Sequence, residues 1–499
     1  MKIIFVEPVG TGIPALGPMF LSAVLKRDGF NDVELISLTE GNVSKRRSKE
    51  YLFEKLKEKP VVGITSTTPV WAEAVKIAEL AKDHGCTVIV GGPGPSIWKE
   101  KLLEKYPFID FVVFGEGEQI IIPLIKAIQE GREPENLPGV SYRNNKGQII
   151  PGQANPLIKD LDSLPYADRD CLDLQTYHCA LSILTSRGCP YNCAFCFKPV
   201  HGLVFRTRTP KNVVDEIEWL LKTYPDIAKK VDYRVVIADD IFNLDMKRAK
   251  EIADEIIKRK VNCKLVFVNG FHAKHVDLEL MQKLKAAGTV EIWFGCDAGS
   301  EKILASLGKG VTLDMVRNAV KLARQASIPT IGMHFIIGLE GENIETARET
   351  IAFARSLDLD AIGFNHANVL PGTRLWDYAV NYGRLLQETD GFNFAKFKQL
   401  EGIPIFETPE FSQKDRIKAF EEAIVLMDEI RRKDTLKPGK ILKFVSSLRS
   451  PADFLWAIGR AKTFFLSKNL RLQKKKPQPS KLAEYRKAIP AAEAEAKGD

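Results

Sequence analysis

Short apolar runs alternate with amphipathic stretches in two separate blocks of this chain, and this alternation sets the class of fold. In the first block the apolar runs are residues 2–6, 33–35, 61–65, 87–90 and 111–114. In the second block they are residues 181–185, 233–238, 264–269, 291–296, 330–338 and 361–365. Because strands that alternate with helices build βαβ units, each block predicts a parallel sheet.

The two blocks predict an α/β protein with two domains. Residues 1–135 are expected to form a doubly wound, Rossmann-like parallel sheet, and ligands bind such sheets outside the carboxyl ends of their strands. Four turn-rich loops would share that rim, at residues 7–12, 66–69, 91–96 and 115–118. After a linker at 136–180, the six strand–helix units of residues 181–390 predict a partial (β/α)6 barrel of the TIM type. Residues 391–472 read as mainly helical, and 473–499 as a disordered tail.

The net charge of +8 is concentrated near the C-terminus. Residues 431–476 hold 14 Lys and Arg against 2 Asp and Glu, a local +12 that leaves about −4 for the rest. This gives no reason to expect nucleic-acid binding by the main body. The sequence contains no run of 18 apolar residues and no signal peptide is recognised, so we expect a cytoplasmic protein.

Three of the eight cysteines form a motif, TSRGCPYNCAFCFKP, in which Cys189, Cys193 and Cys196 are spaced as Cys-x3-Cys-x2-Cys. The other five are scattered and read as buried apolar residues. A zinc site would need a fourth ligand, which His201 could supply. An iron–sulfur cluster needs only three thiolates if its fourth iron is left for another ligand. We favour the cluster.

The motif, with Phe195 before its last cysteine, resembles the signature of the radical S-adenosylmethionine (SAM) enzymes, whose fold is a partial (β/α)6 barrel. The resemblance implies a [4Fe-4S] cluster whose open iron binds SAM and whose electron cleaves SAM to a 5′-deoxyadenosyl radical. Later segments, VVIADDIFNLD, WFGCDAGSEKILASLGKG and HFIIGLEGE, resemble family segments in the same order. The residues that the resemblance assigns to SAM are Phe195, Asp239, Asp297, Ser300, Ile337 and Gly338. Many relatives carry Glu where Asp297 stands.

The first block, placed ahead of such a core, resembles the cobalamin-binding domain of the cobalamin-dependent radical SAM class. The residues that the resemblance assigns to cobalamin are Ser66, Thr67, Gly91, Gly92, Gly115 and Glu116. Glycines at 91 and 92 would let the backbone approach a flat macrocycle. The chain lacks the Asp-x-His-x-x-Gly loop of many cobalamin domains, since its first histidine is His84. A weakly coordinated or uncoordinated lower face, above residues 9–12, is therefore expected, and a domain that binds nothing is the alternative.

Three further features of the sequence have two possible interpretations each. His334 is read more readily as a core histidine than as an inward-pointing site residue. Arg187 could pair with a carboxylate or cap the cysteine loop. The basic amphipathic stretch within 440–472 could contact a membrane surface or dock on the barrel.

The predicted function is a class B radical SAM methyltransferase that methylates an unactivated carbon, with SAM, cobalamin and a [4Fe-4S] cluster as cofactors. Hydrogen abstraction by a nucleoside radical requires no side-chain base, and no catalytic residue is assigned. The alternatives are a ring-forming or rearranging enzyme of the same class and a non-catalytic cobalamin sensor. A small-molecule or lipid-like substrate and an electron donor such as flavodoxin or ferredoxin are the expected partners.

Overall fold

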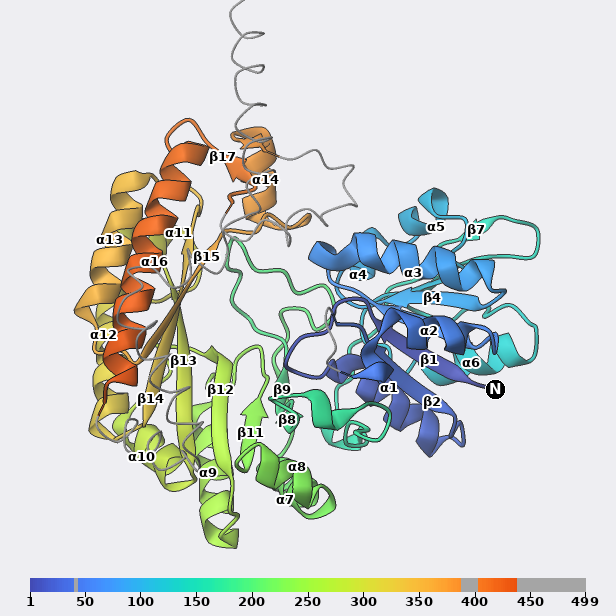
Figure 1. The fold of residues 1–499 in the computed structure, drawn as a ribbon, viewed down its shortest axis with the longest axis horizontal. Helices are drawn as coiled ribbons and strands as arrows, with labels where there is room; N and C mark the ends of the chain where they lie inside the picture. The colour runs from blue at the N-terminus through green and yellow to red at the C-terminus, as the bar shows by residue number, and fades with distance from the viewer. Residues whose placement is uncertain (40–43, 387–402, 438–499) are drawn as a thin grey trace, which may run out of the picture.

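The computed structural model describes residues 1–39, 44–386 and 403–437, and Figure 1 shows two lobes joined by a long connecting segment. The N-terminal lobe holds a seven-stranded sheet in the order β2-β1-β3-β4-β5-β6-β7. Its strands are β1 (Ile3–Glu7), β2 (Val33–Ser37), β3 (Val61–Thr65), β4 (Thr87–Gly91), β5 (Phe111–Val113), β6 (Val140–Arg143) and β7 (Ile149–Ile150). The five strands from β1 to β5 are parallel, as predicted.

Helices cover both faces of this sheet, so the expected doubly wound architecture is confirmed (Figure 1). The α-helices of the lobe are α1 (Leu16–Arg27), α2 (Lys49–Leu56), α3 (Trp71–Asp83), α4 (Pro95–Trp98), α5 (Lys101–Lys105) and α6 (Ile121–Gln129). Helices α1 and α6 bury apolar residues in the core shared with the barrel, whereas α2, α3 and α5 enclose a second core on the opposite face. The alternation of inward residues along β1 explains this division, because Ile3 and Phe5 enter the first core while Ile4 and Val6 enter the second.

A hairpin extends this sheet past residue 135. Strands β6 and β7 pair antiparallel with each other, and β6 pairs antiparallel with β5. The turn between them is fixed by the Asn144 side chain, whose Oδ1 accepts from the N–H groups of Lys146 and Gln148. The first part of the predicted linker therefore belongs structurally to the N-terminal sheet.

The second lobe is an open six-stranded sheet in the order β15-β14-β13-β12-β11-β8, all parallel, which matches the predicted partial barrel. Its strands are β8 (Ser182–Ile183), β11 (Arg234–Ile237), β12 (Lys264–Phe271), β13 (Thr289–Asp297), β14 (Thr330–Ile337) and β15 (Ala361–His366). The α-helices are α7 (Pro210–Thr223), α8 (Pro225–Lys230), α9 (Met246–Arg259), α10 (Leu278–Ala286), α11 (Glu301–Ser306), α12 (Leu313–Gln325), α13 (Ile344–Ser356), α14 (Arg374–Asn381) and α16 (Gln413–Thr435). Short 3-10 helices lie outside this lobe, in the N-terminal lobe as η1 (Lys45–Arg47) and η2 (Thr68–Val70) and in the connecting segment as η3 (Leu161–Ser163) and η4 (Leu174–Thr176).

Local sequence sets where the barrel helices begin. Helices α7, α9, α10, α12 and α13 are each preceded by a residue whose side chain accepts a hydrogen bond from a backbone N–H of the first turn, which stabilises the helix start. These N-caps are Thr209, Asp245, Asp277, Thr312 and Asn343. The helices then return along the outer face of the sheet (Figure 1).

The predicted first barrel strand, 181–185, is interrupted. Strand β8 ends at Ile183, and the chain continues as β9 (Ser186–Arg187), which pairs antiparallel with β10 (Arg206–Thr207) instead of with the barrel. Residues 188–205 therefore form a closed loop with a two-stranded base, and this loop carries the three cysteines.

Part of the C-terminal region completes the barrel. Helix α16 packs against β14 and β15, and a small ladder pairs β16 (Arg384–Leu385) with β17 (Phe406–Glu407). None of the described helices is long and apolar enough to cross a membrane. The predicted membrane-contact segment 440–472 and the predicted tail 473–499 lie outside the described residues.

Candidate functional site

The cysteine loop lies at the carboxyl end of β8, where the chemistry of a barrel is expected. The Cys196 N–H donates to the Cys193 carbonyl at 3.0 Å, forming a turn between the last two cysteines. The Ala194 N–H donates to the Leu307 carbonyl at 2.9 Å, which attaches the loop to the segment after α11. Cys189 is buried and the other two are half-buried.

The donor set fits a [4Fe-4S] cluster better than a single ion. Among the described residues, no three His, Cys, Asp or Glu side chains converge on a point that one metal ion could occupy. A cubane cluster places each thiolate on its own iron, so its ligands need not converge. Burial raises the pKa of the Cys189 thiol, and it raises that of Cys193 to about 11. Binding to iron would therefore displace a proton from each of these thiols.

The backbone of the loop depends on a glycine at its base. Gly188 has φ +80°, and a Cβ there would stand 2.3 Å from the Val204 carbonyl oxygen. This close approach lets the two ends of the loop meet, so the chain can curve around a compact ligand.

His201, the candidate fourth ligand of a zinc site, contacts a carboxylate in the structure. Its Nδ1 lies 3.4 Å from Asp240 Oδ2, and the same carboxylate oxygen accepts the Gly188 N–H at 3.0 Å. His201 and Asp240 thus bridge the two ends of the cysteine loop.

Asp239, assigned to SAM by resemblance, is almost fully buried beneath the loop. Its carboxylate accepts the Thr185 N–H at 2.6 Å and the hydroxyls of Thr185 and Ser186 at 2.5 and 2.7 Å. These hydrogen bonds fix the backbone where the chain passes from β8 to β9. Burial raises the pKa of Asp239, although Arg248 and these hydrogen bonds oppose that shift. Its contact with SAM stays a prediction, whereas its bracing of the cysteine loop is direct.

Asp297 lies at the end of β13 with a partner that the sequence did not identify. Lys309 Nζ donates to Asp297 Oδ2 and to the Gly295 carbonyl, each at 2.5 Å. Burial alone would lower the pKa of Lys309, but the adjacent carboxylate raises it, which keeps the ammonium charged. Cys193 also acts electrostatically on this lysine, so a buried cation faces the cysteine loop. The only feature of the sequence that could have indicated a role for Lys309 is the pair of glycines on either side of it, in the Leu-Gly-Lys-Gly stretch.

A second group missed by sequence reasoning lies beside the cysteines. The Tyr191 ring stacks on His272 with centroids 4.4 Å apart, and its hydroxyl lies 2.5 Å from His275 Nε2. Burial, reinforced by the charge of Lys309, lowers the pKa of His272 to about 3, so this imidazole is neutral. The stacked rings of Tyr191 and His272 therefore add no charge beside the motif cysteines.

Glycines on adjacent strands make room for large side chains on the inner face of the barrel. A Cβ on Gly332 would stand 2.3 Å from the Trp293 ring, and one on Gly363 would stand 2.8 Å from His334 Nδ1. Trp293 and His334 stack with centroids 4.5 Å apart, and both are half-buried. His334 therefore lies on the inner face and not in the closed core.

The remaining residues assigned to SAM are dispersed along the carboxyl ends of the strands. Ser300 is buried at the start of α11, and Ile337 is buried in the main core. Gly338 has φ +100°, and a Cβ there would stand 2.3 Å from an Arg416 nitrogen. Phe195 is half-buried against the core. Their contacts with SAM stay predictions.

The carboxyl ends of β3 and β4 bring together four of the predicted cobalamin residues, Ser66, Thr67, Gly91 and Gly92. Ser66 N–H donates to the Gly91 carbonyl at 3.0 Å, and a Cβ on Gly92 would stand 2.8 Å from Thr65 Oγ1. Gly92 is thus explained first by the close packing of two neighbouring loops. Thr67 is exposed at this rim and free to face a ligand. His84 ends α3, where its Nδ1 lies 2.8 Å from the Leu80 carbonyl.

The fourth rim loop, after β5, turns away from solvent and toward the barrel. Glu116 has a fully buried side chain and accepts hydrogen bonds from Arg187 Nη1 at 3.1 Å and Arg206 Nη1 at 2.7 Å. Arg187 therefore pairs with a carboxylate, which resolves its two interpretations. Gly115 beside it packs on the Asn155 side chain. Direct contact of Gly115 and Glu116 with cobalamin stays a prediction.

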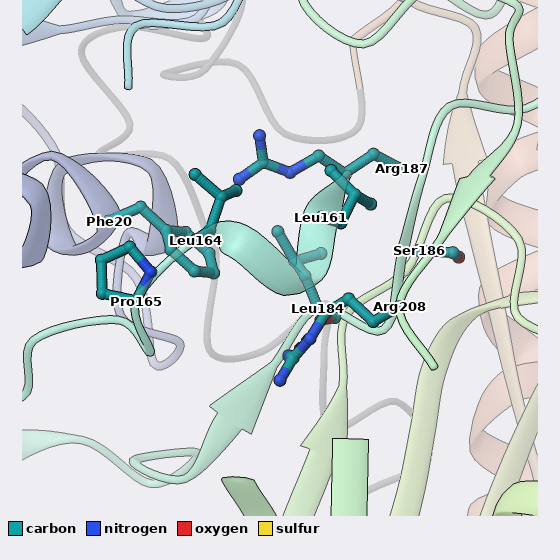
Figure 2. A pocket seen from close by; sticks show the side chains of 8 residues that line it. All are labelled: Phe20, Leu161, Leu164, Pro165, Leu184, Ser186, Arg187 and Arg208. Atoms are coloured by element: carbon teal, nitrogen blue, oxygen red, sulfur yellow. Dashed lines mark hydrogen bonds between the residues drawn. The ribbon is translucent and has the colours of Figure 1, made fainter. Parts of the chain in front are cut away.

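A small hollow adjoins this contact between the lobes (Figure 2). Figure 2 shows its lining residues, which are Phe20, Leu161, Leu164, Pro165, Leu184, Ser186, Arg187 and Arg208. Its volume is about 260 Å³, a figure that includes space open to solvent, so the enclosed part is smaller still. We therefore assign it no substrate.

Comparison with known proteins identifies both lobes. The family model of the radical SAM superfamily matches residues 183–354, and that of the B12 binding domain matches residues 2–124. The uncharacterized methyltransferase PH0819 of Pyrococcus horikoshii is 31% identical over 449 residues, which cover 85% of this chain and 92% of that protein. The chain belongs to the cobalamin-dependent radical SAM enzymes. Its cofactors are accordingly a [4Fe-4S] cluster, SAM and cobalamin.

Two further similar proteins match at lower sequence identity. The anaerobic magnesium-protoporphyrin IX monomethyl ester cyclase of Rubrivivax gelatinosus is 27% identical, covering 80% of this chain and 72% of that one. The solved structure of the radical SAM methyltransferase TsrM from Kitasatospora setae superposes with a TM-score of 0.64 at 23% identity. It covers 78% of this chain and 82% of the TsrM chain, and it shows that the fold is shared.

Proposed function

We propose that this enzyme is a cobalamin-dependent radical SAM methyltransferase that transfers a methyl group to an unactivated carbon of a small molecule. The observation that carries the proposal is the junction of the two lobes. The closed three-cysteine loop of the barrel is bonded directly to the loop after β5 on the rim of the cobalamin-binding domain. A radical source and a methyl carrier held by these two elements would be neighbours.

When bound, the cofactors supply a hydrogen-abstracting radical and a transferable methyl group. The protein's part is to bind and orient them. Cys189, Cys193 and Cys196 would ligate three irons. Asp239 fixes the segment between β8 and β9 from which their loop begins. The Lys309–Asp297 pair places opposite charges next to the loop. Because SAM carries a carboxylate and an ammonium group, a buried pair of opposite charges suits its polar end.

The relatives favour methyl transfer but leave a second candidate. PH0819 is named a methyltransferase, as is a Streptomyces wedmorensis relative, cytidylyl-2-hydroxyethylphosphonate methyltransferase, at 24% identity. The Rubrivivax gelatinosus protein is named a cyclase. A ring-forming reaction without methyl transfer is therefore the alternative.

Product analysis distinguishes the two reactions. The protein is reconstituted anaerobically with iron, sulfide and cobalamin, then reduced and supplied with SAM and candidate substrates. Methyl transfer predicts both 5′-deoxyadenosine and S-adenosylhomocysteine, with a product heavier by one CH2 unit. Formation of 5′-deoxyadenosine alone, with an oxidised product, would support the cyclase-like alternative. Cobalamin binding without any SAM cleavage would indicate a sensor.

We further infer that a small redox protein such as flavodoxin or ferredoxin supplies the electron in a cytoplasmic setting. The basic segment 440–472 supports peripheral membrane contact and a lipid-like substrate. Anionic vesicles test this inference, because the full chain should bind them and a chain ending at residue 437 should not. Equal binding by both would overturn it.

A further inference from the structure

Four charged side chains meet where the two lobes join, and we call Glu116, Glu118, Arg187 and Arg206 the junction network. Arg187 donates from Nη1 to Glu116 Oε1 at 3.1 Å and from Nη2 to Glu118 Oε1 at 2.5 Å. Arg206 Nη1 donates to Glu116 Oε2 at 2.7 Å. All four side chains are at least nine-tenths buried. Two carboxylates are thus matched by two guanidinium groups.

The network joins three segments that are far apart in the sequence. The glutamates lie on the rim loop after β5, and the arginines occupy paired positions on β9 and β10, at the base of the cysteine loop. The connecting segment enters through Ile158, whose N–H donates to Glu116 at 2.7 Å and whose carbonyl accepts from Arg206 at 2.6 Å. The rim loop, the connecting segment and the cysteine loop therefore share one set of hydrogen bonds.

Buried charges of this kind contribute geometry more than stability. Removing four charged groups from water costs nearly as much as their mutual attraction returns, so apolar residues could join the lobes as well. A planar guanidinium that bonds two carboxylates tolerates little displacement, because each bond is directional. Burial alone would raise the pKa of Glu116, but Arg206, the Ile158 N–H and Arg187 lower it, so the carboxylate stays ionised.

We propose that the junction network sets the separation and orientation of the cobalamin-binding rim relative to the cysteine loop, so that its members are positioning residues for transfer between the two cofactors. The proposal rests on the proposed function, because it concerns the spacing of a methyl carrier and a radical source. It assigns no direct cofactor contact to Arg187 or Arg206.

The test compares two variants with a matched control. E116Q removes the central charge at constant size. R187K keeps the charge but cannot bond Glu116 and Glu118 with one planar fork. The control is E216Q, because Glu216 is equally buried and pairs with Arg169 and Arg208 but has no bond to the rim loop.

Two measurements report position without relying on turnover. The first is hydrogen–deuterium exchange of protein loaded with the cluster but not with cobalamin. E116Q and R187K are expected to speed exchange in residues 155–158 and 188–205, and E216Q is expected to leave these residues as in the wild type. The second is the magnetic dipolar coupling between cob(II)alamin and the reduced cluster, whose distance distribution should broaden in E116Q and R187K alone.

Turnover then shows whether position matters. The ratio of 5′-deoxyadenosine to methylated product is expected to rise by about tenfold in E116Q, since a displacement of about 1 Å can cost about 100-fold in rate. Unchanged exchange and distance distributions in folded R187K would overturn the proposal, as would equal changes in E216Q. If the wild type failed to bind cobalamin or to methylate, the proposed function would fall, while the exchange data would still decide whether the network holds the loops.

Discussion

At the scale of single residues, the three motif cysteines are distinguished from the other five by what surrounds them. The motif thiols lie in one loop that a charged lysine faces. By contrast, Cys263 is enclosed in the apolar core, where burial raises its pKa to about 12 with no charged group to oppose the shift. A thiol in such surroundings ionises less readily, which disfavours metal binding.

We therefore expect C193A to lower the iron and sulfide content of the reconstituted protein by at least about tenfold, because two thiolates hold a cubane poorly. SAM cleavage should be lost with it. The matched control is C179A, which removes a half-buried thiol outside the loop and should leave the iron content unchanged. Equal loss of iron in both variants would contradict the assignment.

The carboxyl group of Glu342 should make stability depend on pH. Burial raises its pKa from 4.5 to about 7, against the opposing effects of the Gly338 and Leu339 N–H groups and Arg416. A group that binds its proton more tightly when folded stabilises the fold below its unfolded pKa, and this contribution is lost as the pH rises to the folded value. The free energy of unfolding should thus fall by up to about 3 kcal/mol between pH 4.5 and 7.

Denaturant titrations across this pH range measure the effect. E342Q, which cannot ionise, should flatten the decline. E345Q, which changes an exposed glutamate three residues later in the first turn of α13, should retain it. A wild-type slope in E342Q would show that Glu342 is ionised throughout.

At the scale of elements, the cysteine loop depends on its closed base. We expect G188A to lose about 2 kcal/mol or more, because φ +80° is strained for alanine and its Cβ would meet the Val204 carbonyl. G202A is the matched control in the same loop, since φ is +66° but the nearest atom would be 3.8 Å away. Thermal unfolding and iron content should both fall more in G188A. Equal losses would mean that backbone strain alone matters.

The sequence predicted the elements of this protein better than the contacts between them. Strand positions could be predicted because short apolar runs are bounded by turns and by capping residues such as Asp245 and Asp277. The split of the first barrel strand could not, because it depends on Asp239, 54 residues beyond Thr185. Lys309, Arg206 and His272 were missed for the same reason, since their roles arise from partners distant in sequence.

At the scale of the whole molecule, one apolar core crosses from one lobe to the other. It contains Met19 of α1, Leu172 and Tyr177 of the connecting segment, and Phe267 of the barrel. The connecting segment is thus a packed layer between the lobes, unlike a linker whose ends move independently. The junction network sits beside this layer, so charge geometry and apolar packing hold the same interface.

A continuous core predicts that both lobes unfold together. Denaturant unfolding of the apoprotein should give one transition, with coincident midpoints for amides of β3 in the first lobe and of β13 in the second, each followed by hydrogen exchange. L172A should move both midpoints equally, at a cost of about 2–4 kcal/mol, because it opens a cavity in the shared layer. The control is L52A in α2, within the separate core on the far face of the first sheet. If unfolding of L172A showed two separated transitions while L52A showed one, the connecting layer would be what couples the lobes. Two transitions in the wild-type protein would show that the lobes fold independently and that the junction network is their main link.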